Sequence, residues 1–294
     1  MNAIGIDIGG MSIYAGLVDE EANIIKSVRY KTSKDREENL KNIIMAIDEL
    51  MIDKVEGIGI GSPGSIDHKK GRVTQLSGNI ENWAYTDIKA HILRYYPDYL
   101  IRVENDANVA ALCEKWKGSA TDLESFVLLT LGTGLGGSVY VNSDFVRGQN
   151  FKGAELGHAI LFPGGRNCFC GQRGCAEKYV SASAIMTNYY NLTGENIDTK
   201  EIFQKSKNDL DAKSAIDKFC HDLAIYLVSL KNIFDPEAFI IAGGILKAHE
   251  NWWDLMKKYY NEYINISDAT QILRAKFLSD AGLIGAAGLI LARD

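Results

Sequence analysis

Residues 153–181, GAELGHAILFPGGRNCFCGQRGCAEKYVS, hold the densest group of metal-binding side chains in the sequence. Cys168, Cys170 and Cys175 fall close together, and His158 precedes the first of them by ten positions. Thiolate and imidazole are the ligands that zinc prefers, and four of them fill a tetrahedral site and leave no position for water. The stretch therefore predicts a structural zinc site. The alternatives are a chance cluster of cysteines and a disulfide, which is disfavoured in a chain with no recognisable export signal.

Two glutamates flank these proposed ligands. Glu155 lies three residues before His158, and Glu177 lies two residues after Cys175, so a metal here would fix both carboxylates. Carboxylates accept hydrogen bonds in defined directions, and a polyol such as a sugar offers a ring of donors. The pair therefore indicates a sugar site, against the alternative of two ordinary surface glutamates.

The pattern ELGH, followed by CFCGQRGCAE at residues 168–177, resembles the signature of the ROK family of sugar kinases and sugar-responsive repressors. The resemblance implies that His158 both binds zinc and contacts the sugar. It also implies that Glu155 and Glu177 bind sugar hydroxyls.

The resemblance extends over essentially the whole chain and implies an α/β protein with the two-domain actin-like ATPase (ribonuclease H-like) fold and an interdomain cleft. The 294 residues are enough for two domains with separate cores. The family's chain returns to its first domain at the end. We therefore expect a small domain of residues 1–107 plus 282–294 and a large domain of residues 108–281 that carries the zinc loop.

Composition and charge exclude other classes of protein. An apolar content of 46% and a charged content of 24% are ordinary for a globular protein. The net charge of -6 argues against a nucleic-acid binder, whose affinity depends on neutralising phosphates. The strand pattern begins at Ala3, without a cleavable leader, and the longest small and apolar run, residues 281–292, is too short to span a bilayer. We expect a cytoplasmic protein without nucleic-acid or membrane partners and, from the family, a homodimer.

The first apolar run, residues 3–8, contains Asp7 near its end and is followed by Gly9 and Gly10 and by a second apolar run, residues 13–18. This pattern predicts a strand, a tight turn and a strand. Glycine amides bind phosphate, and a carboxylate at a strand end holds hydrated Mg²⁺. A plain hairpin is the alternative.

In ROK and actin-like kinases this hairpin is the first phosphate loop, usually DxGGT, so the resemblance implies that Asp7, Gly9 and Gly10 contact the nucleotide and its Mg²⁺. Met11 stands where the family has threonine. A thioether cannot donate a hydrogen bond to phosphate, so Ser12 is the candidate replacement donor.

A second glycine loop repeats this design. Residues 125–131 form an apolar run, Gly132 to Gly137 read GTGLGG, and residues 138–141 form a second run. Two hairpins of one design indicate two halves built on related sheets, and Thr133 supplies the hydroxyl that Met11 lacks. The nucleotide-binding residues expected here are Gly132, Thr133, Gly134 and Gly136.

A third glycine pair follows the strand predicted at residues 238–242. Gly243 and Gly244 stand between this strand and a helix, a junction that suits a nucleotide, with a simple turn as the alternative. In the family this loop packs on adenosine.

The resemblance also places the remaining sugar-site residues. Gly64 and Ser65 belong to a G-x-P-G turn, and Asn79 lies in LSGNIENW, which is similar to the family's N-L-x-x-W segment. Spacing alone predicts that Asp106, between a strand and a helix, is the helix N-cap. The motif ENDAN, which matches the family's catalytic motif, instead implies that Asp106 is the general base and that Asn105 holds the sugar beside it.

Helices are predicted at residues 37–51, 87–96, 109–116, 181–190, 211–234 and 282–291. Residues 37–51 and 211–234 each carry an apolar stripe at helical spacing. The last helix, residues 282–291, is rich in glycine and alanine, which permits close packing on its neighbours.

The sequence thus predicts ATP-dependent phosphorylation of a hexose or N-acyl-hexosamine at the 6-hydroxyl, with ATP, Mg²⁺ and a structural Zn²⁺. The alternative is a non-catalytic sugar sensor or a degenerate kinase. ROK repressors carry a helix–turn–helix before the first strand, and this sequence starts at that strand. The sequence does not choose between glucose, N-acetylmannosamine, N-acetylglucosamine and a β-glucoside.

Overall fold

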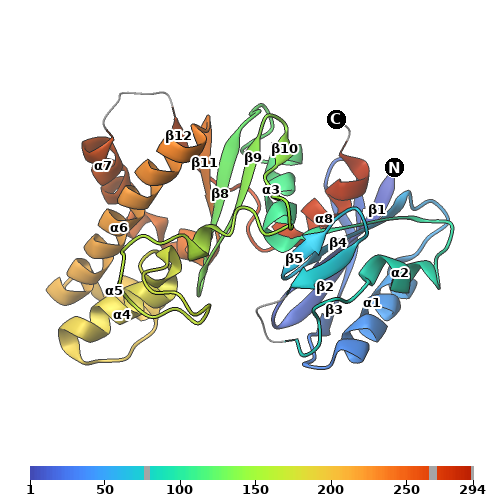
Figure 1. Ribbon diagram of the computed structural model, residues 1–294, viewed down its shortest axis with the longest axis horizontal. Coiled ribbons are helices and arrows are strands. Elements are labelled where there is room, and N and C mark those ends of the chain that lie inside the picture. The colour runs from blue at the N-terminus through green and yellow to red at the C-terminus, as the bar shows by residue number, and fades with distance from the viewer. Residues whose placement is uncertain (76–79, 265–269, 293–294) are drawn as a thin grey trace. The chain divides into compact units, whose positions relative to one another are not determined.

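The computed structural model describes residues 1–75, 80–264 and 270–292 and divides the chain into two compact units (Figure 1). Unit 1 comprises Met1–Asp122, Val146–Gly153 and Lys276–Asp294, and unit 2 comprises Leu123–Phe145 and Ala154–Ala275. These units do not coincide with the predicted domains, whose boundaries fall after residues 107 and 281. The predicted boundaries stay a prediction.

Each unit is built on a five-stranded sheet, and the two sheets have the same topology. In both, three consecutive antiparallel strands are followed by two strands parallel to the first of them. The predicted pair of related halves is therefore confirmed. The sheet of unit 1 has the order β3 (Ile24–Lys31), β2 (Ser12–Asp19), β1 (Asn2–Ile8), β4 (Gly57–Ser62), β7 (Leu100–Asn105). The sheet of unit 2 has the order β10 (Asp144–Phe145), β9 (Leu135–Val141), β8 (Phe126–Leu131), β11 (Ala238–Ala242), β12 (Gln271–Arg274).

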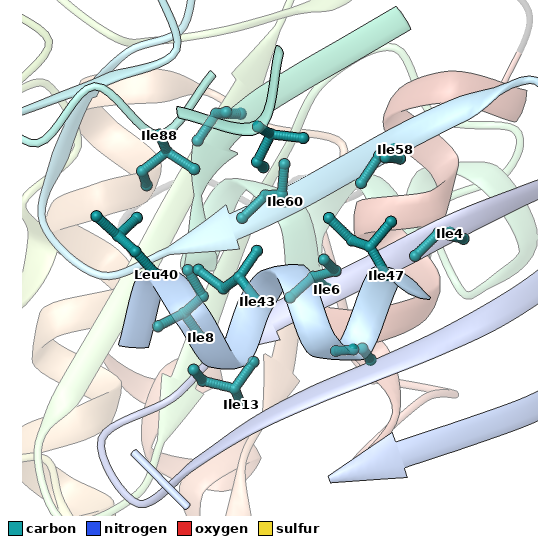
Figure 2. Packing of buried hydrophobic residues seen from close by; sticks show 14 of the residues in the cluster. Ile4, Ile6, Ile8, Ile13, Leu40, Ile43, Ile47, Ile58, Ile60 and Ile88 are labelled. Carbon is teal, nitrogen blue, oxygen red and sulfur yellow. The ribbon is translucent and has the colours of Figure 1, made fainter. Parts of the chain in front are cut away.

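Helix α1 (Arg36–Leu50) covers one face of the first sheet. Its predicted apolar stripe is confirmed, since Leu40, Ile43 and Ile47 are buried against alternate residues of β1, such as Ile4 and Ile6 (Figure 2). Complete burial of one such side chain stabilises the fold by about 2 kcal/mol. The helix begins where the carboxylate of its N-cap residue, Asp35, accepts a backbone hydrogen bond from the first turn.

Helix α8 (Ala281–Leu291) lies so close to the other face that no side chain fits at Gly5 or Gly59. A Cβ atom at Gly5 would stand 2.1 Å from the Leu283 carbonyl oxygen, and one at Gly59 would stand 1.8 Å from the Ala286 carbonyl oxygen. The small residues of the last helix therefore do permit close packing. Helix α3 (Asp106–Lys117) packs on α8 in the same way, which is why it belongs to unit 1.

The helices of unit 2 pack around α6 (Leu210–Phe234), the long amphipathic helix predicted from periodicity. The sequence did not predict α5 or α7. The remaining elements are α2 (Ile88–Leu93), β5 (Ser65–Asp67) and β6 (Arg72–Gln75) in unit 1, and α4 (Ala182–Thr193), α5 (Thr199–Lys205), α7 (Trp253–Tyr263) and the 3-10 helices η1 (Leu156–His158), η2 (Ala176–Lys178) and η3 (Gly244–Asn251) in unit 2. Across the described residues, no helix is both long and apolar enough to cross a bilayer.

Candidate functional site

The expected first phosphate loop is the hairpin turn between β1 and β2. The Gly9 amide donates a 2.9 Å hydrogen bond to the Ser12 carbonyl oxygen, which closes the turn. Thr32, at the end of β3, secures it from outside: its hydroxyl donates to the Gly9 carbonyl at 2.7 Å, and its amide donates to the Met11 carbonyl at 3.1 Å. Gly10 is exposed on the turn. Sequence reasoning missed Thr32 because only strand pairing brings it to the loop.

Asp7 stands beside this loop, against the first turn of α8. A Cβ atom at Gly282 would lie 2.4 Å from the Asp7 carboxyl carbon, so only glycine fits there. Burial raises the pKa of Asp7 to about 6, and the nearby Arg29 charge opposes this shift. A divalent cation next to the carboxylate would favour its ionised form. Asp7 is thus suited to hold Mg²⁺.

Three loops of unit 1 meet at one edge of its sheet. Strands β1, β4 and β7 run parallel, and Asp7 pairs with Gly61 while Ser62 pairs with Asn105. The strand ends therefore place the phosphate loop, the Pro63–Gly64 turn and the start of α3 side by side. Open α/β sheets bind ligands at this carboxyl edge.

The start of α3 corrects one expectation. Asn105, not Asp106, caps the helix, because the Asn105 side-chain oxygen accepts hydrogen bonds from the amides of Ala107 (2.9 Å) and Asn108 (3.3 Å). The prediction that Asp106 is the N-cap is wrong. Asp106 is exposed, and its carboxylate accepts the Ala107 amide at 2.9 Å.

Asn105 also ties this junction to the neighbouring turn. Its side-chain nitrogen donates to the Gly64 carbonyl at 3.0 Å, and Gly64 has a φ of 94°, which glycine adopts without strain. Ser65 is buried and starts β5. Asn79 lies outside the described residues.

A buried ion pair supports the same junction. Glu104 is 3% exposed, and one carboxylate oxygen accepts the Asn105 amide at 2.9 Å and the Asn108 side chain at 3.1 Å. The other oxygen accepts Arg147 Nε at 2.7 Å. Glu104 belongs to the ENDAN motif, from which no role for it was predicted, and Arg147 was not predicted because it is distant in sequence.

In unit 2 the structure brings together the four predicted zinc ligands. One donor atom from each of His158, Cys168, Cys170 and Cys175 lies within 4.8 Å of all the others. The Cys170 and Cys175 sulfurs are 3.6 Å apart, and the Cys168 sulfur is 3.8 Å from His158 Nδ1. A tetrahedral site with Zn–S of about 2.3 Å and Zn–N of about 2.0 Å requires donor separations of roughly 3.5–3.8 Å. The four donors fit a zinc ion.

The zinc segment also carries the two predicted sugar-binding acids. Glu177, in η2, is 9% exposed and accepts the Cys168 thiol at 3.2 Å. The Ala176 amide donates to the Ala159 carbonyl at 2.8 Å, which holds η2 alongside the end of η1. Glu155 immediately precedes η1 and is exposed.

The expected second phosphate loop is the turn between β8 and β9. The Gly132 amide donates to the Gly134 carbonyl at 3.0 Å, and the exposed Thr133 lies at the tip. The start of α4 supports this turn, since the Ser183 hydroxyl donates to the Thr133 carbonyl at 2.7 Å. Gly136 follows on β9, where a Cβ atom would stand 2.5 Å from the Thr130 hydroxyl oxygen.

A cavity of about 820 Å³ connects this loop with the third glycine pair. Gly132 and Thr133 line one part of it, and Gly244 and Ile245 line another. Gly243 has a φ of 93° and directly follows β11, whose last residue pairs with Thr130 near the end of β8. The remaining lining residues come from α4, α5, η3 and their flanks, and they were not predicted: Ala182, Thr199, Lys200, Phe203, Gln204, Lys207, Lys247, Ala248, Glu250 and Asn251.

Comparisons with known proteins agree with these features. The model of the ROK family matches residues 3–293. Glucokinase from Thermotoga maritima is 33% identical over 315 aligned residues, which cover 100% of this chain and 98% of that protein.

Two solved structures extend the agreement to the fold. The ROK hexokinase from Thermus thermophilus has a TM-score of 0.87 and 31% identity, with 99% of this chain and 98% of that chain covered. The ROK family glucokinase from Streptomyces griseus, in complex with glucose and AMPPNP, has a TM-score of 0.84 and 31% identity, with 100% of both chains covered. The predicted actin-like ATPase fold is confirmed, and the match over almost the whole length shows that the chain belongs to the ROK family.

Proposed function

We propose that this protein transfers the terminal phosphoryl group of ATP to the 6-hydroxyl of a hexose or an N-acyl-hexosamine. The observation that carries the proposal is the shared carboxyl edge in unit 1, where Asp7, the phosphate loop and Asp106 end parallel strands of one sheet. Phosphoryl transfer requires positioned reactants and neutralised charge more than covalent chemistry by the protein. The two carboxylates provide a cation site and a base for that reaction.

Each residue at this edge has a distinct role in the proposal. Asp106 is exposed and takes the proton from the sugar hydroxyl as its oxygen attacks phosphorus. Asp7 would hold Mg²⁺, which would neutralise charge on the phosphates when bound. The amides of Gly9 and Gly10 bind the phosphate groups.

In unit 2, the amides of the second phosphate loop (Gly132, Thr133, Gly134 and Gly136) are proposed to bind the same nucleotide. The cavity next to them combines apolar walls, Phe203 and Ile245, with polar side chains, Gln204 and Asn251. This mixture suits a purine base and its ribose, so we assign Gly243 and Gly244 to the nucleoside.

Sugar hydroxyls are assigned to Glu155, His158 and Glu177 in unit 2, and to Gly64, Ser65, Asn79 and Asn105 in unit 1. The zinc site, His158 with the three cysteines, is proposed to fix the first group rather than to take part in chemistry, because four protein ligands leave no open position. Metal analysis tests this role. We expect one zinc per chain, its loss in Cys175→Ser, and its retention in Cys113→Ala, which changes a cysteine outside the cluster.

Turnover on a panel of sugars tests the proposed function. The panel contains glucose, N-acetylmannosamine, N-acetylglucosamine and a β-glucoside, with glucose first because the relatives compared above include two glucokinases. We expect sugar-dependent release of ADP with at least one of them. Sugar binding without ADP release from any of them would support the sugar sensor instead. The predicted homodimer stays a prediction, which light scattering of the purified protein can test.

A further inference from the structure

The first phosphate loop has no side-chain hydrogen-bond donor at position 11. Met11 is 88% exposed, and its thioether has no hydrogen to donate. Ser12, the predicted replacement, keeps its O–H donor, and its hydroxyl oxygen accepts a hydrogen bond from Arg29 Nη1 at 3.2 Å. The loop therefore has a guanidinium group next to the position where a hydroxyl donor is missing.

Strand pairing brings Arg29 to this loop. Asp7 on β1 pairs with Tyr14 on β2, and Tyr14 pairs with Arg29 on β3, so these three side chains share one face of the sheet. Ser12 is on the same face, two residues closer to the turn. The hydrogen bond to Ser12 thus shows that the Arg29 side chain extends along the sheet toward the phosphate loop.

Tyr14 orients the guanidinium group. The guanidinium carbon of Arg29 stands 4.0 Å from the centre of the Tyr14 ring, a cation–π contact. A guanidinium group held on an aromatic ring loses little freedom when it binds a ligand, and its planar fork matches phosphate oxygens. The Tyr14 contact therefore prepares Arg29 to bind an anion.

Arg29 also retains charge and donors for a ligand. Its side chain is exposed, and among the residues that the structure describes it forms no ion pair with a carboxylate. Arginine carries five N–H donors and stays protonated at any physiological pH. The Ser12 hydroxyl oxygen accepts a hydrogen bond from one of these N–H donors, which leaves the others for a ligand.

We propose that Arg29 binds the terminal phosphate of MgATP at the first phosphate loop and so replaces the hydroxyl contact that Met11 cannot make. This assignment rests on the proposed kinase function and names a donor-binding residue of that same site. In this assignment, Ser12 and Tyr14 hold the guanidinium group of Arg29 in place.

Direct binding measurements test this assignment apart from turnover. Arg29→Gln is compared with Arg36→Gln, which removes an equal charge from the exposed start of α1. Calorimetry measures the Kd of a nonhydrolysable MgATP analogue, of adenosine and of the sugar. Because Arg29→Gln loses one charge-assisted contact, the Kd of the analogue should rise by about tenfold or more in this variant. Adenosine and sugar should bind as in the wild type, and Arg36→Gln should change none of the three.

A rescue experiment tests the replacement itself. Met11→Thr restores a hydroxyl donor, so it should recover a substantial part of the lost analogue affinity in Arg29→Gln, and it should have a smaller effect in the wild type. Arg29→Lys keeps the charge but loses the fork, and we expect an intermediate affinity. It also provides a folded comparison should Arg29→Gln fail to fold.

Two results would overturn the assignment: equal analogue affinity in Arg29→Gln and Arg36→Gln, or equal effects of Met11→Thr with and without Arg29. Either result leaves the kinase proposal standing if the wild type still releases ADP with a sugar. Conversely, a wild type that binds the analogue but phosphorylates no sugar refutes the kinase proposal, and the binding comparison still decides the role of Arg29.

Discussion

Gly134 of the second phosphate loop lies directly against the carboxylate of Glu177, since a Cβ atom at residue 134 would stand 2.9 Å from Glu177 Oε2. The other oxygen of that carboxylate accepts the thiol of Cys168 at 3.2 Å. The zinc segment, a proposed sugar-binding acid and a proposed phosphate loop are thus in contact within unit 2. We therefore expect a substitution in the loop to move the Glu177 carboxylate and so to change the affinity for the sugar.

The variant Gly134→Ala tests that contact. The added methyl group must displace the Glu177 side chain, so we expect the sugar Kd to rise by roughly tenfold, the usual consequence of losing a hydrogen bond to a charged group. Gly132→Ala is the matched control for sugar affinity, because a Cβ atom at residue 132 has no neighbour within 4 Å. Equal sugar affinity in both variants would mean that Glu177 does not bind the sugar or does not move.

A second prediction concerns the contact between α3 and α8. A Cβ atom at Gly285 would stand 1.9 Å from the Val109 carbonyl oxygen, so Gly285→Ala must push two helices apart. We expect a loss of about 1–3 kcal/mol in the free energy of unfolding. Gly288→Ala meets its nearest neighbour, a carbon of the Trp116 ring, only at 3.1 Å and should cost less. Urea denaturation measures the free energy of unfolding of both variants. A larger loss in Gly288→Ala than in Gly285→Ala would contradict the close backbone packing.

The raised pKa of Asp7 gives a pH prediction for the metal-free protein. Because burial raises this pKa from 3.8 to about 6, the folded state holds the proton more tightly than the unfolded state. Ionisation of Asp7 therefore removes stability as the pH rises from about 4 to about 6. Asp7→Asn avoids this loss and should be more stable than the wild type at neutral pH, by on the order of 2–3 kcal/mol.

Thermal melting across this pH range, without Mg²⁺, measures the effect of Asp7→Asn. The stability that Asp7→Asn gains over the wild type should shrink as the pH falls toward 4. The control Asp53→Asn, which changes an exposed carboxylate, should show no such trend. A gain that stays constant with pH would indicate a cause other than the charge of Asp7.

The buried pair of Glu104 and Arg147 supports a further stability prediction. Arg147→Met leaves the Glu104 carboxylate, 3% exposed, without this partner and should cost about 3–5 kcal/mol in the free energy of unfolding. Lys117→Met is the control, because the Glu21 side chain that it pairs with is 73% exposed and the pair should contribute at most about 1 kcal/mol. Similar small losses in both variants would show that the Arg147 contact is not needed at this junction.

The repeated sheets and the zinc cluster could be predicted because their signals are local. The pattern of strand, glycine turn and strand occurs twice, and the four zinc ligands lie within 18 consecutive residues of the chain. The N-cap of α3 was predicted wrongly, since Asn105 and Asp106 are both good capping residues and only the backbone decides between them.

Other parts of the candidate site could not be predicted, because their residues are distant in sequence. Thr32 and Arg29 reach the first phosphate loop only through the pairing of β2 with β3. Arg147 meets Glu104 only in the folded unit. Helices α5 and α7 were missed as well, and with α5 one side of the cavity next to Thr133.

The variant Asp106→Asn tests the central claim most directly, measured as sugar-dependent ADP release together with the sugar Kd. Because a general base contributes about 100-fold or more to the rate, turnover should fall by at least that factor, while the sugar Kd should stay close to that of the wild type. Near-normal turnover in Asp106→Asn, with a wild type that phosphorylates the same sugar, would contradict the account.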